Sequence, residues 1–176
     1  HYFFNRNNTS GVSSSKITSA SQADTNTIWF GSSNGGLNKF NKINQTFEHF
    51  FVENGLPSNY ITALHHSDNK TLWISSKNGI TNFNLPDNRM LNYNLYDGLS
   101  DLDFFRNSVS SSKSGNIYFG GPKGLTIIRP SEIKFNSYKP PCLITKLQKS
   151  YFDGSSETVF LNKQGKANNE KITIDH

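Results

Sequence analysis

"NTIWFGSSNGGLNKF", residues 26–40, decides the fold, because two later segments of the chain have nearly the same sequence. "KTLWISSKNGITNF" follows at 70–83 and "GNIYFGGPKGLTII" at 115–128. Each phrase has an apolar run with an aromatic residue, then a glycine-containing turn, then a second apolar run. A self-similar segment at a fixed period is the signature of a repeat architecture. The sequence therefore contains three copies of one unit.

The period of the repeat follows from its aromatic position. Trp29, Trp73 and Tyr118 are 44 and 45 residues apart. The segment before each phrase keeps the same spacing, since "GVSSSKITSA" at 11–20 aligns with "GLPSNYITAL" at 55–64, and "GLSDL" opens the third copy. Two independent landmarks with one period make the repeat secure.

Each unit resolves into four short strands, which are clearest in the second copy. The predicted strands are 60–66 "YITALHH", 71–76 "TLWISS", 80–85 "ITNFNL" and 89–95 "RMLNYNL". Turn-forming Asn, Asp, Gly and Pro separate them. Four strands repeated every 40–50 residues or so are typical of a β-propeller blade. A helical repeat would need apolar residues at a spacing of 3.6, and this spacing is missing.

The repeated residues have structural interpretations. We expect the aromatic residue of each copy to fill the space between stacked blades rather than to form a ligand platform. Gly36, Gly79 and Gly124 are predicted to adopt a positive φ, in a turn where a Cβ would clash. No helix follows these glycines, so a nucleotide-binding loop is not expected.

Composition excludes several classes of function. The chain has 176 residues with 14 Phe, 7 Tyr and 2 Trp, and its net charge is +5 with a pI near 9.3. The Lys residues are scattered, so no nucleic-acid partner is expected. The single cysteine, Cys142, excludes an intrachain disulfide and a zinc site with several thiolates. We expect no cofactor.

No apolar run is long enough to span a membrane, and no signal peptide is visible. The chain begins at His1 rather than Met, which favours a segment excised from a longer protein. Three blades cannot close a ring, and an open stack leaves apolar faces exposed. We therefore expect the chain to pair with a second copy as a homodimer, or to be part of a longer protein.

The phrases at 26–40 and 70–83, together with the opening "GLPSNYITAL", resemble the two-component regulator propeller repeat. The third copy resembles the form that closes the last propeller of such sensors, through "GNIYFGG" and a trailing "PSEI". "SYKPPCLITKLQ" at 137–148 resembles the opening of a Y_Y_Y domain, an immunoglobulin-like sandwich, and "EKITIDH" at 170–176 would be one of its strands. "DFFRN" at 103–107 departs from the usual small-residue pattern.

The fold class expected is all-β: a partial β-propeller of about three four-stranded blades, followed by the first strands of an Ig-like β-sandwich. The expected parts are the last strand of a preceding blade at 1–10, blades at 11–54 and 55–97, a closing blade at 98–136, and a truncated sandwich at 137–176.

The resemblance implies the extracytoplasmic, periplasmic part of a bacterial sensor. The parent would be a histidine kinase, often a hybrid one, anchored in the inner membrane through parts outside this chain. It would respond to a carbohydrate or another nutrient and relay the signal through dimer geometry. Two alternatives stay open: the sensor region of a diguanylate cyclase, and a β-propeller enzyme that acts on polysaccharides.

The residues themselves give little support for catalysis. His65 and His66 are adjacent on a strand and point to opposite faces, so they cannot chelate one ion together. Asp101 and Asp103 could act as paired carboxylates, but they lie in the opening loop of one copy only. The serine runs, one of them next to Lys113, have no candidate base. We expect this chain to be no enzyme and to hold no metal.

A ligand site is expected on the rim where two kinds of turn emerge on the same face: the turns between second and third strands, and the links between blades. Amides and carboxylates can pair with sugar hydroxyls, and an aromatic ring can stack on a sugar. The predicted ligand-binding residues, for an oligosaccharide, are Asn34, Asn59, Tyr60, Lys77, Asn78, Asp101 and Lys123.

Overall fold

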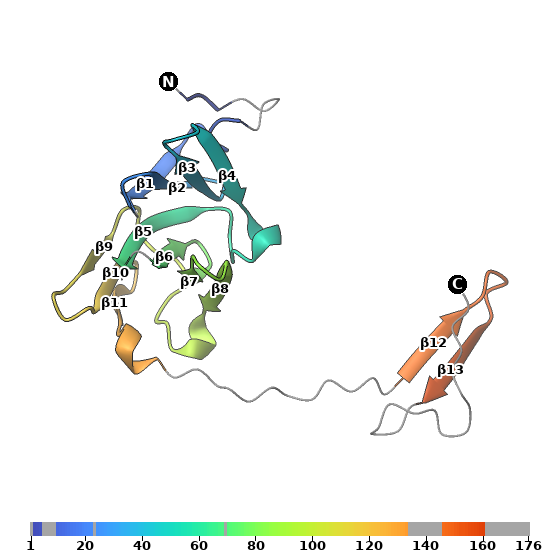
Figure 1. Ribbon diagram of the computed structural model, residues 1–176. Helices are drawn as coiled ribbons and strands as arrows, with labels where there is room; N and C mark the ends of the chain where they lie inside the picture. Colours follow the sequence, from blue (N-terminus) through green and yellow to red (C-terminus); the bar gives the residue numbers. More distant parts are fainter. Residues whose placement is uncertain (1, 5–9, 23, 69, 134–145, 161–176) are drawn as a thin grey trace. The chain divides into compact units, whose positions relative to one another are not determined.

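The computed structural model describes residues 2–4, 10–22, 24–68, 70–133 and 146–160 (Figure 1). The chain forms two compact units, 1–133 and 134–176. The strands are β1 (Ile17–Gln22), β2 (Thr27–Ser32), β3 (Leu37–Asn41), β4 (Thr46–Phe50), β5 (Ile61–Asp68), β6 (Thr71–Ser76), β7 (Gly79–Asn84), β8 (Arg89–Tyr93), β9 (Val109–Ser111), β10 (Ile117–Gly121), β11 (Gly124–Ile128), β12 (Lys146–Ser150) and β13 (Ser156–Phe160). The short 3₁₀ turns are η1 (Val52–Asn54), η2 (Leu95–Asp97) and η3 (Pro130–Glu132).

The first unit consists of three antiparallel sheets, one for each copy of the repeat. The first sheet has the order β1-β2-β3-β4 and the second β5-β6-β7-β8, so every strand pairs with the next one in the sequence. This meander is the topology of a propeller blade. The four strands predicted for the second copy are all present, with bounds shifted by at most two residues. The all-β fold class is confirmed.

The third sheet has three strands among the described residues, in the order β11-β10-β9. The short β9 pairs with β10 through Ser111, Ser110 and Val109 only. After β11 the chain enters η3, and residues 134–145 are not among those described. The fourth strand expected for the closing blade is not among the described residues.

The first strands of the three sheets are neighbours, with β1 beside β5 and β5 beside β9 (Figure 1). Thr18 Oγ1 donates a hydrogen bond of 2.6 Å to the carbonyl of Ile61, which joins β1 to β5. Asn107 N donates to the carbonyl of Thr62 at 2.9 Å, which joins the segment before β9 to β5. The first strand of each blade lies innermost in a propeller, and these three sheets are arranged in that manner.

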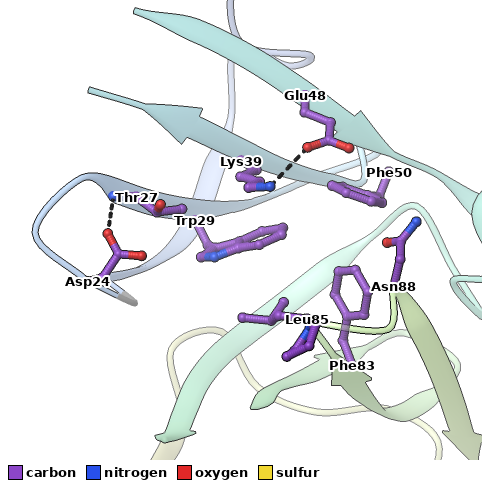
Figure 2. A pocket seen from close by; sticks show the side chains of 10 residues that line it. Asp24, Thr27, Trp29, Lys39, Glu48, Phe50, Phe83, Leu85 and Asn88 are labelled. Carbon is purple, nitrogen blue, oxygen red and sulfur yellow. Dashed lines mark hydrogen bonds and ion pairs between the residues drawn. The ribbon is translucent and has the colours of Figure 1, made fainter. Parts of the chain in front are cut away.

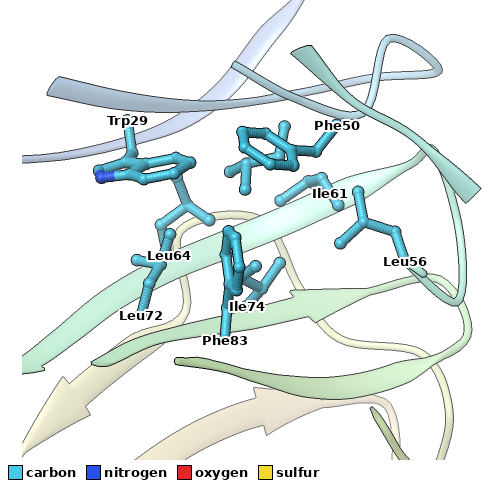
Figure 3. Packing of buried hydrophobic residues seen from close by; sticks show 9 residues of the cluster. Trp29, Phe50, Leu56, Ile61, Leu64, Leu72, Ile74 and Phe83 are labelled. Atoms are coloured by element: carbon cyan, nitrogen blue, oxygen red, sulfur yellow. The ribbon is translucent and has the colours of Figure 1, made fainter. Parts of the chain in front are cut away.

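The first hydrophobic core lies between the first and second sheets (Figure 3). Trp29 and Phe50 from the first sheet face Phe83 from the second, with ring centroids 5.7 Å and 5.4 Å from that of Phe83. The aliphatic residues that complete this core are Leu37, Leu56, Ile61, Leu64, Leu72 and Ile74. Burying each large apolar side chain contributes roughly 1.5–3 kcal/mol, so this contact holds the two sheets together.

The second core lies between the second and third sheets and is centred on Trp73. Its side chain is fully buried, and its ring stacks on that of Tyr93 at 6.0 Å. The other buried members are Ile80, Leu99, Phe104, Ile117 and Phe119. Trp29 and Trp73 thus occupy equivalent places between sheets. The prediction that these aromatic residues are core rather than ligand platforms is confirmed for both tryptophans.

The third sheet leaves its equivalent face open among the described residues. Tyr118 aligns with the two tryptophans but is only half-buried. Leu125 follows the turn glycine as Leu37 and Ile80 do, yet it is 60% exposed where those two are 0% exposed. Ile127 on β11 is 41% exposed. This sheet therefore presents an apolar face of the kind that the next sheet covers in the other two copies.

The turn glycines have the backbone conformation that the sequence predicted. Gly36, Gly79 and Gly124 have φ of 64°, 100° and 101°, a region that favours glycine. A Cβ at Gly36 would collide with the carbonyl oxygen of Phe50, and one at Gly79 would collide with that of Tyr93. At these two positions both the backbone conformation and the lack of space require glycine. At Gly124 the predicted clash is wrong, because a Cβ there would meet no described atom within 4 Å.

The second unit contains one described feature, the hairpin of β12 and β13. The segments that resemble a Y_Y_Y domain lie largely outside the described residues, including all of 170–176. At the other end, residues 2–4 are not in a strand, although the ring of Tyr2 packs on those of Phe40 and Phe47 at 4.9 Å and 5.3 Å. Residues 1 and 5–9 of the strand expected there are outside the described part.

Candidate functional site

The turns between second and third strands meet the links that lead into the following sheet. Gly36 N donates a hydrogen bond of 2.8 Å to the carbonyl of Asn59, and Gly79 N donates one of 2.8 Å to that of Leu102. Each turn is thus completed by the link into the next sheet. In the second copy the contact is reinforced by Asn78 Nδ2, which donates to the carbonyl of Pro57 at 3.0 Å. These bonds fix the backbone on which the predicted site residues lie.

Four side chains gather at this rim, and we call them the rim cluster: Tyr60, Lys77, Asp103 and Arg106. The ammonium of Lys77 lies 2.7 Å from Oδ2 of Asp103 and 5.7 Å from the centroid of the Tyr60 ring. The guanidinium of Arg106 lies 5.5 Å from the same centroid. Its Nε donates to the Tyr60 hydroxyl at 3.0 Å, and its Nη2 donates to the same oxygen. An aromatic ring with one cation near its centroid and a second bonded to its hydroxyl is the central element of the site.

Electrostatics at the rim cluster favour negative charge on the Tyr60 oxygen. The hydrogen bond from Arg106 is the largest cause that lowers the pKa of Tyr60, followed by one from Ser33. The charges of Arg106 and Lys77 act in the same direction, and burial opposes them. Hydrogen bonds to the charged form and nearby opposite charges both lower the pKa of an acid. The phenol oxygen therefore marks a point of positive potential.

The structure brings some of the predicted site residues together and not others. Tyr60 and Lys77 belong to the rim cluster, and Asn78 lies beside it in the β6–β7 turn. Asn34 is exposed in the β2–β3 turn with φ of 67°. Lys123 is exposed in the β10–β11 turn of the third sheet.

The side chains of Asn59 and Asp101 contact the chain's own backbone. Asn59 Oδ1 accepts a hydrogen bond from Val52 N at 2.9 Å, and Asp101 Oδ1 accepts one from Leu102 N at 2.8 Å. Short polar side chains commonly make such local bonds in turns. These two residues shape the links between sheets, and their acceptor oxygens are engaged there.

The sequence did not identify Arg106 as a site residue, and it presented Asp103 only as the possible partner of Asp101. The structure gives the two carboxylates different roles, since Asp103 pairs with Lys77 while Asp101 bonds backbone. The available signal was "DFFRN", which departs from the usual pattern of the closing repeat. That departure places Phe104 in the second core and Arg106 against Tyr60.

The two adjacent histidines lie on β5, away from the rim turns. His66 Nδ1 is 2.7 Å from Oγ of Ser21 on β1. Burial lowers its pKa to about 4, and the nearby His65 adds to the effect. Within the described residues, no three His, Cys, Asp or Glu side chains form a group that could hold a metal. His66 is therefore a neutral, half-buried contact between two sheets.

A separate cleft of about 430 Å³ opens between the first and second sheets (Figure 2). Trp29, Phe50 and Phe83 form its floor, and polar residues including Asp24 and Asn88 form its edge. The floor rings are almost fully buried. The ammonium of Lys39 lies 5.7 Å from the centroid of the Trp29 ring and 3.2 Å from Glu48. The cleft thus follows the contact between the two sheets, and the aromatic rings on its floor are already buried by that contact.

The family model of the two-component regulator propeller matches residues 55–78, a range that contains Tyr60 and Lys77. A histidine kinase of Formosa agariphila is 30% identical over 66 residues, which are 38% of this chain and 5% of that protein. No helix among the described residues is long and apolar enough to cross a membrane.

Two solved structures from B. thetaiotaomicron have a similar fold. The extracellular domain of a hybrid two-component system aligns with a TM-score of 0.65 at 16% identity, over 96% of this chain and 25% of that one. The extracellular domain of a one-component system aligns with a TM-score of 0.58 at 14% identity, over 89% of this chain and 24% of that one. The chain thus spans about a quarter of these domains. Residues 55–78 thus match the two-component regulator propeller, in a chain that shares the fold of these extracellular domains.

Proposed function

We propose that this chain is the ligand-sensing, extracytoplasmic part of a two-component sensor and that its rim cluster contacts the ligand. The observation that supports the proposal is that the family match and the centre of the rim cluster fall in the same segment. The segment that matches the regulator propeller also supplies Tyr60 and Lys77, the centre of the polar cluster. A non-enzymatic binding function fits a site built from an aromatic ring, two cations and one carboxylate.

The ligand proposed is a carbohydrate or a similar hydroxyl-rich nutrient. Arg106 and Lys77 supply donors, and Asp103 supplies an acceptor, all from exposed or half-buried side chains. Sugar hydroxyls both donate and accept, so they need this mixture. The parent protein would be a histidine kinase in the bacterial inner membrane, with this region in the periplasm. The relatives that support this assignment are a histidine kinase and extracellular domains of two-component systems.

Signal transfer in this proposal takes place through a homodimer whose geometry changes on binding. The apolar face with Leu125 and Ile127 supports an association with a further sheet, either of a second copy or of the parent chain. The ordering of rim residues from two sheets around one ligand would then shift the sheets relative to each other.

The test is calorimetric titration of the chain with a panel of oligosaccharides, together with a search for reaction products. We expect binding of at least one saccharide without any product. Tyr60→Ala should abolish this binding, and Tyr96→Ala, at an exposed tyrosine in η2, should not. Release of sugar products would instead support a propeller enzyme, and binding that survives Tyr60→Ala would place the site elsewhere.

A further inference from the structure

We propose that the rim cluster selects an acidic saccharide, one that carries a carboxylate or a sulfate group, and that Arg106 is the residue that selects it. This inference rests on the carbohydrate function proposed above and narrows it to one chemical class. It follows from the charges, the hydrogen bonds and the ring contacts of four side chains.

Arg106 forms no ion pair with a carboxylate in the described part of the chain. The ion pairs found there are Lys39–Glu48, Lys77–Asp103 and Arg129–Glu132. Asp101, the other acid of the same loop, has Oδ1 engaged by backbone N–H groups. Arg106 is exposed, and the polar contact it makes is with a neutral phenol. The cluster therefore has one positive charge without a counter-charge.

The geometry of that contact is the geometry of oxyanion binding. Nε and Nη2 of Arg106 both donate to the single hydroxyl oxygen of Tyr60. This edge of a guanidinium carries two parallel N–H groups, which match the two oxygens of a carboxylate or a sulfate. A phenol offers one oxygen where an acidic sugar offers two. An oxyanion would thus make the better partner for the same edge.

The ring of Tyr60 is an unsuitable platform for a neutral sugar. Both Lys77 and Arg106 lie within 6 Å of its centroid, at 5.7 Å and 5.5 Å. Arg106, which donates to the hydroxyl, lies at the hydroxyl edge of the ring, so a stacked sugar would compete with the cation–π contact of Lys77. A ligand that binds the Nε and Nη2 edge of Arg106 in place of the Tyr60 hydroxyl leaves Lys77 over the ring and avoids this competition. Negative charge on the ligand is what those donors favour.

The potential at the site agrees with this conclusion. Arg106, Ser33 and Lys77 all lower the pKa of the Tyr60 hydroxyl. The hydrogen bonds and charges that favour the phenolate form of Tyr60 would also favour an oxyanion at this point.

The test measures affinity for matched pairs of saccharides by calorimetry at low and high salt. The probes are trigalacturonate against neutral galactotriose, and κ-neocarrabiose sulfate against neocarrabiose, with inorganic sulfate as the sugar-free arm. The variants are Arg106→Gln and Arg106→Lys. Arg89→Gln is the matched control, since Arg89 is exposed and pairs with Asn84 at the end of β7 remote from the rim turn.

We expect at least one acidic probe to bind about tenfold or more tightly than its neutral partner, because a hydrogen bond to a charged group is worth roughly a factor of ten or more. Arg106→Gln should remove this preference, Arg106→Lys should retain part of it, and Arg89→Gln should retain all of it. The preference should weaken at high salt.

Three outcomes overturn the inference and separate it from the proposed function. Binding of neutral probes with no loss in Arg106→Gln leaves carbohydrate sensing in place and removes the acidic selectivity. Binding of inorganic sulfate as tightly as any saccharide retains an anion site and removes the sugar. If no probe binds, both proposals fail for this chain.

Discussion

The hydroxyl of Tyr60 lies 3.0 Å from Nε of Arg106, although the two residues are 46 positions apart in the sequence. Tyr60 immediately precedes β5 of the second sheet, and Arg106 lies in the loop before β9 of the third sheet. The contact therefore bridges two repeats at the rim.

The bridge can be tested through the ionisation of Tyr60. Arg106→Gln removes the group that contributes most to lowering the pKa of Tyr60. We expect the pKa to rise toward the ordinary value of 10.0, because the phenolate loses its donors. Tyrosine-selective NMR titration measures it, and Tyr60→Phe identifies the resonance. The pKa should be unchanged in Arg89→Gln, and an unchanged pKa in Arg106→Gln would show that the bridge does not form in solution.

Asn59 provides a stability test at the same rim. Asn59→Ala removes the acceptor for Val52 N at the start of η1, and we expect a loss of about 1 kcal/mol in the free energy of unfolding. Asn34→Gly, at an exposed turn position whose positive φ glycine tolerates, is the comparison and should cost much less. Urea unfolding followed by circular dichroism gives both values. Equal stability of Asn59→Ala and the unmodified chain would show that the hydrogen bond from Val52 N to Asn59 does not stabilise the fold.

The contribution of Trp73 to stability can be compared with that of Tyr118, the equivalent residue of the third copy. Trp73→Ala empties a fully buried place between the second and third sheets, and we expect a loss of about 3–5 kcal/mol. Tyr118→Ala changes the equivalent but half-exposed residue of the third sheet and should cost about 1 kcal/mol or less. Thermal and urea unfolding provide the comparison. Similar losses for both would mean that the face of the third sheet is covered in solution.

Stability should fall in acid because of His66. Its pKa is about 4 in the folded chain against 6.5 for the unfolded residue, so the unfolded state binds the proton more readily. The free energy of unfolding is unaffected above pH 6.5 and decreases as the pH falls toward 4. One pKa unit corresponds to about 1.4 kcal/mol. Since His66 is only half-buried, we expect solvent screening to reduce the total loss to about 1–2 kcal/mol.

His66→Gln should flatten this pH dependence, as measured by urea unfolding at several pH values between 4 and 7. A smaller slope should remain, because burial also lowers the pKa of His65. An unchanged slope in His66→Gln would locate the acid sensitivity at other groups.

The open face of the third sheet predicts self-association. Leu125 and Ile127 are exposed on β11, and we expect the chain to form a species larger than its 19.8 kDa in solution. A double variant, Leu125→Lys with Ile127→Lys, should shift it toward monomer. Light scattering after size-exclusion chromatography measures this. If the unmodified chain is a monomer at all concentrations, association with a second copy through this face is contradicted, and a further sheet of the longer protein is the occupant that agrees with the result.

The repeated parts of the fold were predictable from the sequence. Trp29 and Trp73 marked the second strand of each sheet, and the turn glycines marked the step to the third, because these residues satisfy local constraints that recur every 44 residues or so. The position of Tyr60 and Lys77 on the rim followed from the same repeat. Periodicity thus determined the strands and the side on which the turns emerge.

The contacts between sheets were not predictable. Arg106 lies in a loop without any repeating pattern, and its direction depends on the burial of Phe104 two residues before it. The contact of His66 with Ser21 depends on how β1 packs beside β5, which no local sequence pattern determines. The packing of side chains between two sheets depends on the tertiary structure and not on the local sequence.

The hydrogen bonds from Gly36 to Asn59 and from Gly79 to Leu102 have a consequence for how such chains gain and lose blades. The turn of one sheet is completed by the link that leads into the next, so a sheet cut out at its own strand ends leaves behind the carbonyl to which its turn glycine donates: Gly79 lies within the second sheet, and Leu102 lies beyond it. The unit that keeps its own turn bond intact runs from the first strand of a sheet, through its fourth strand, to the end of the link that follows. Recombination or protein engineering that respects this frame keeps each of these hydrogen bonds within one unit.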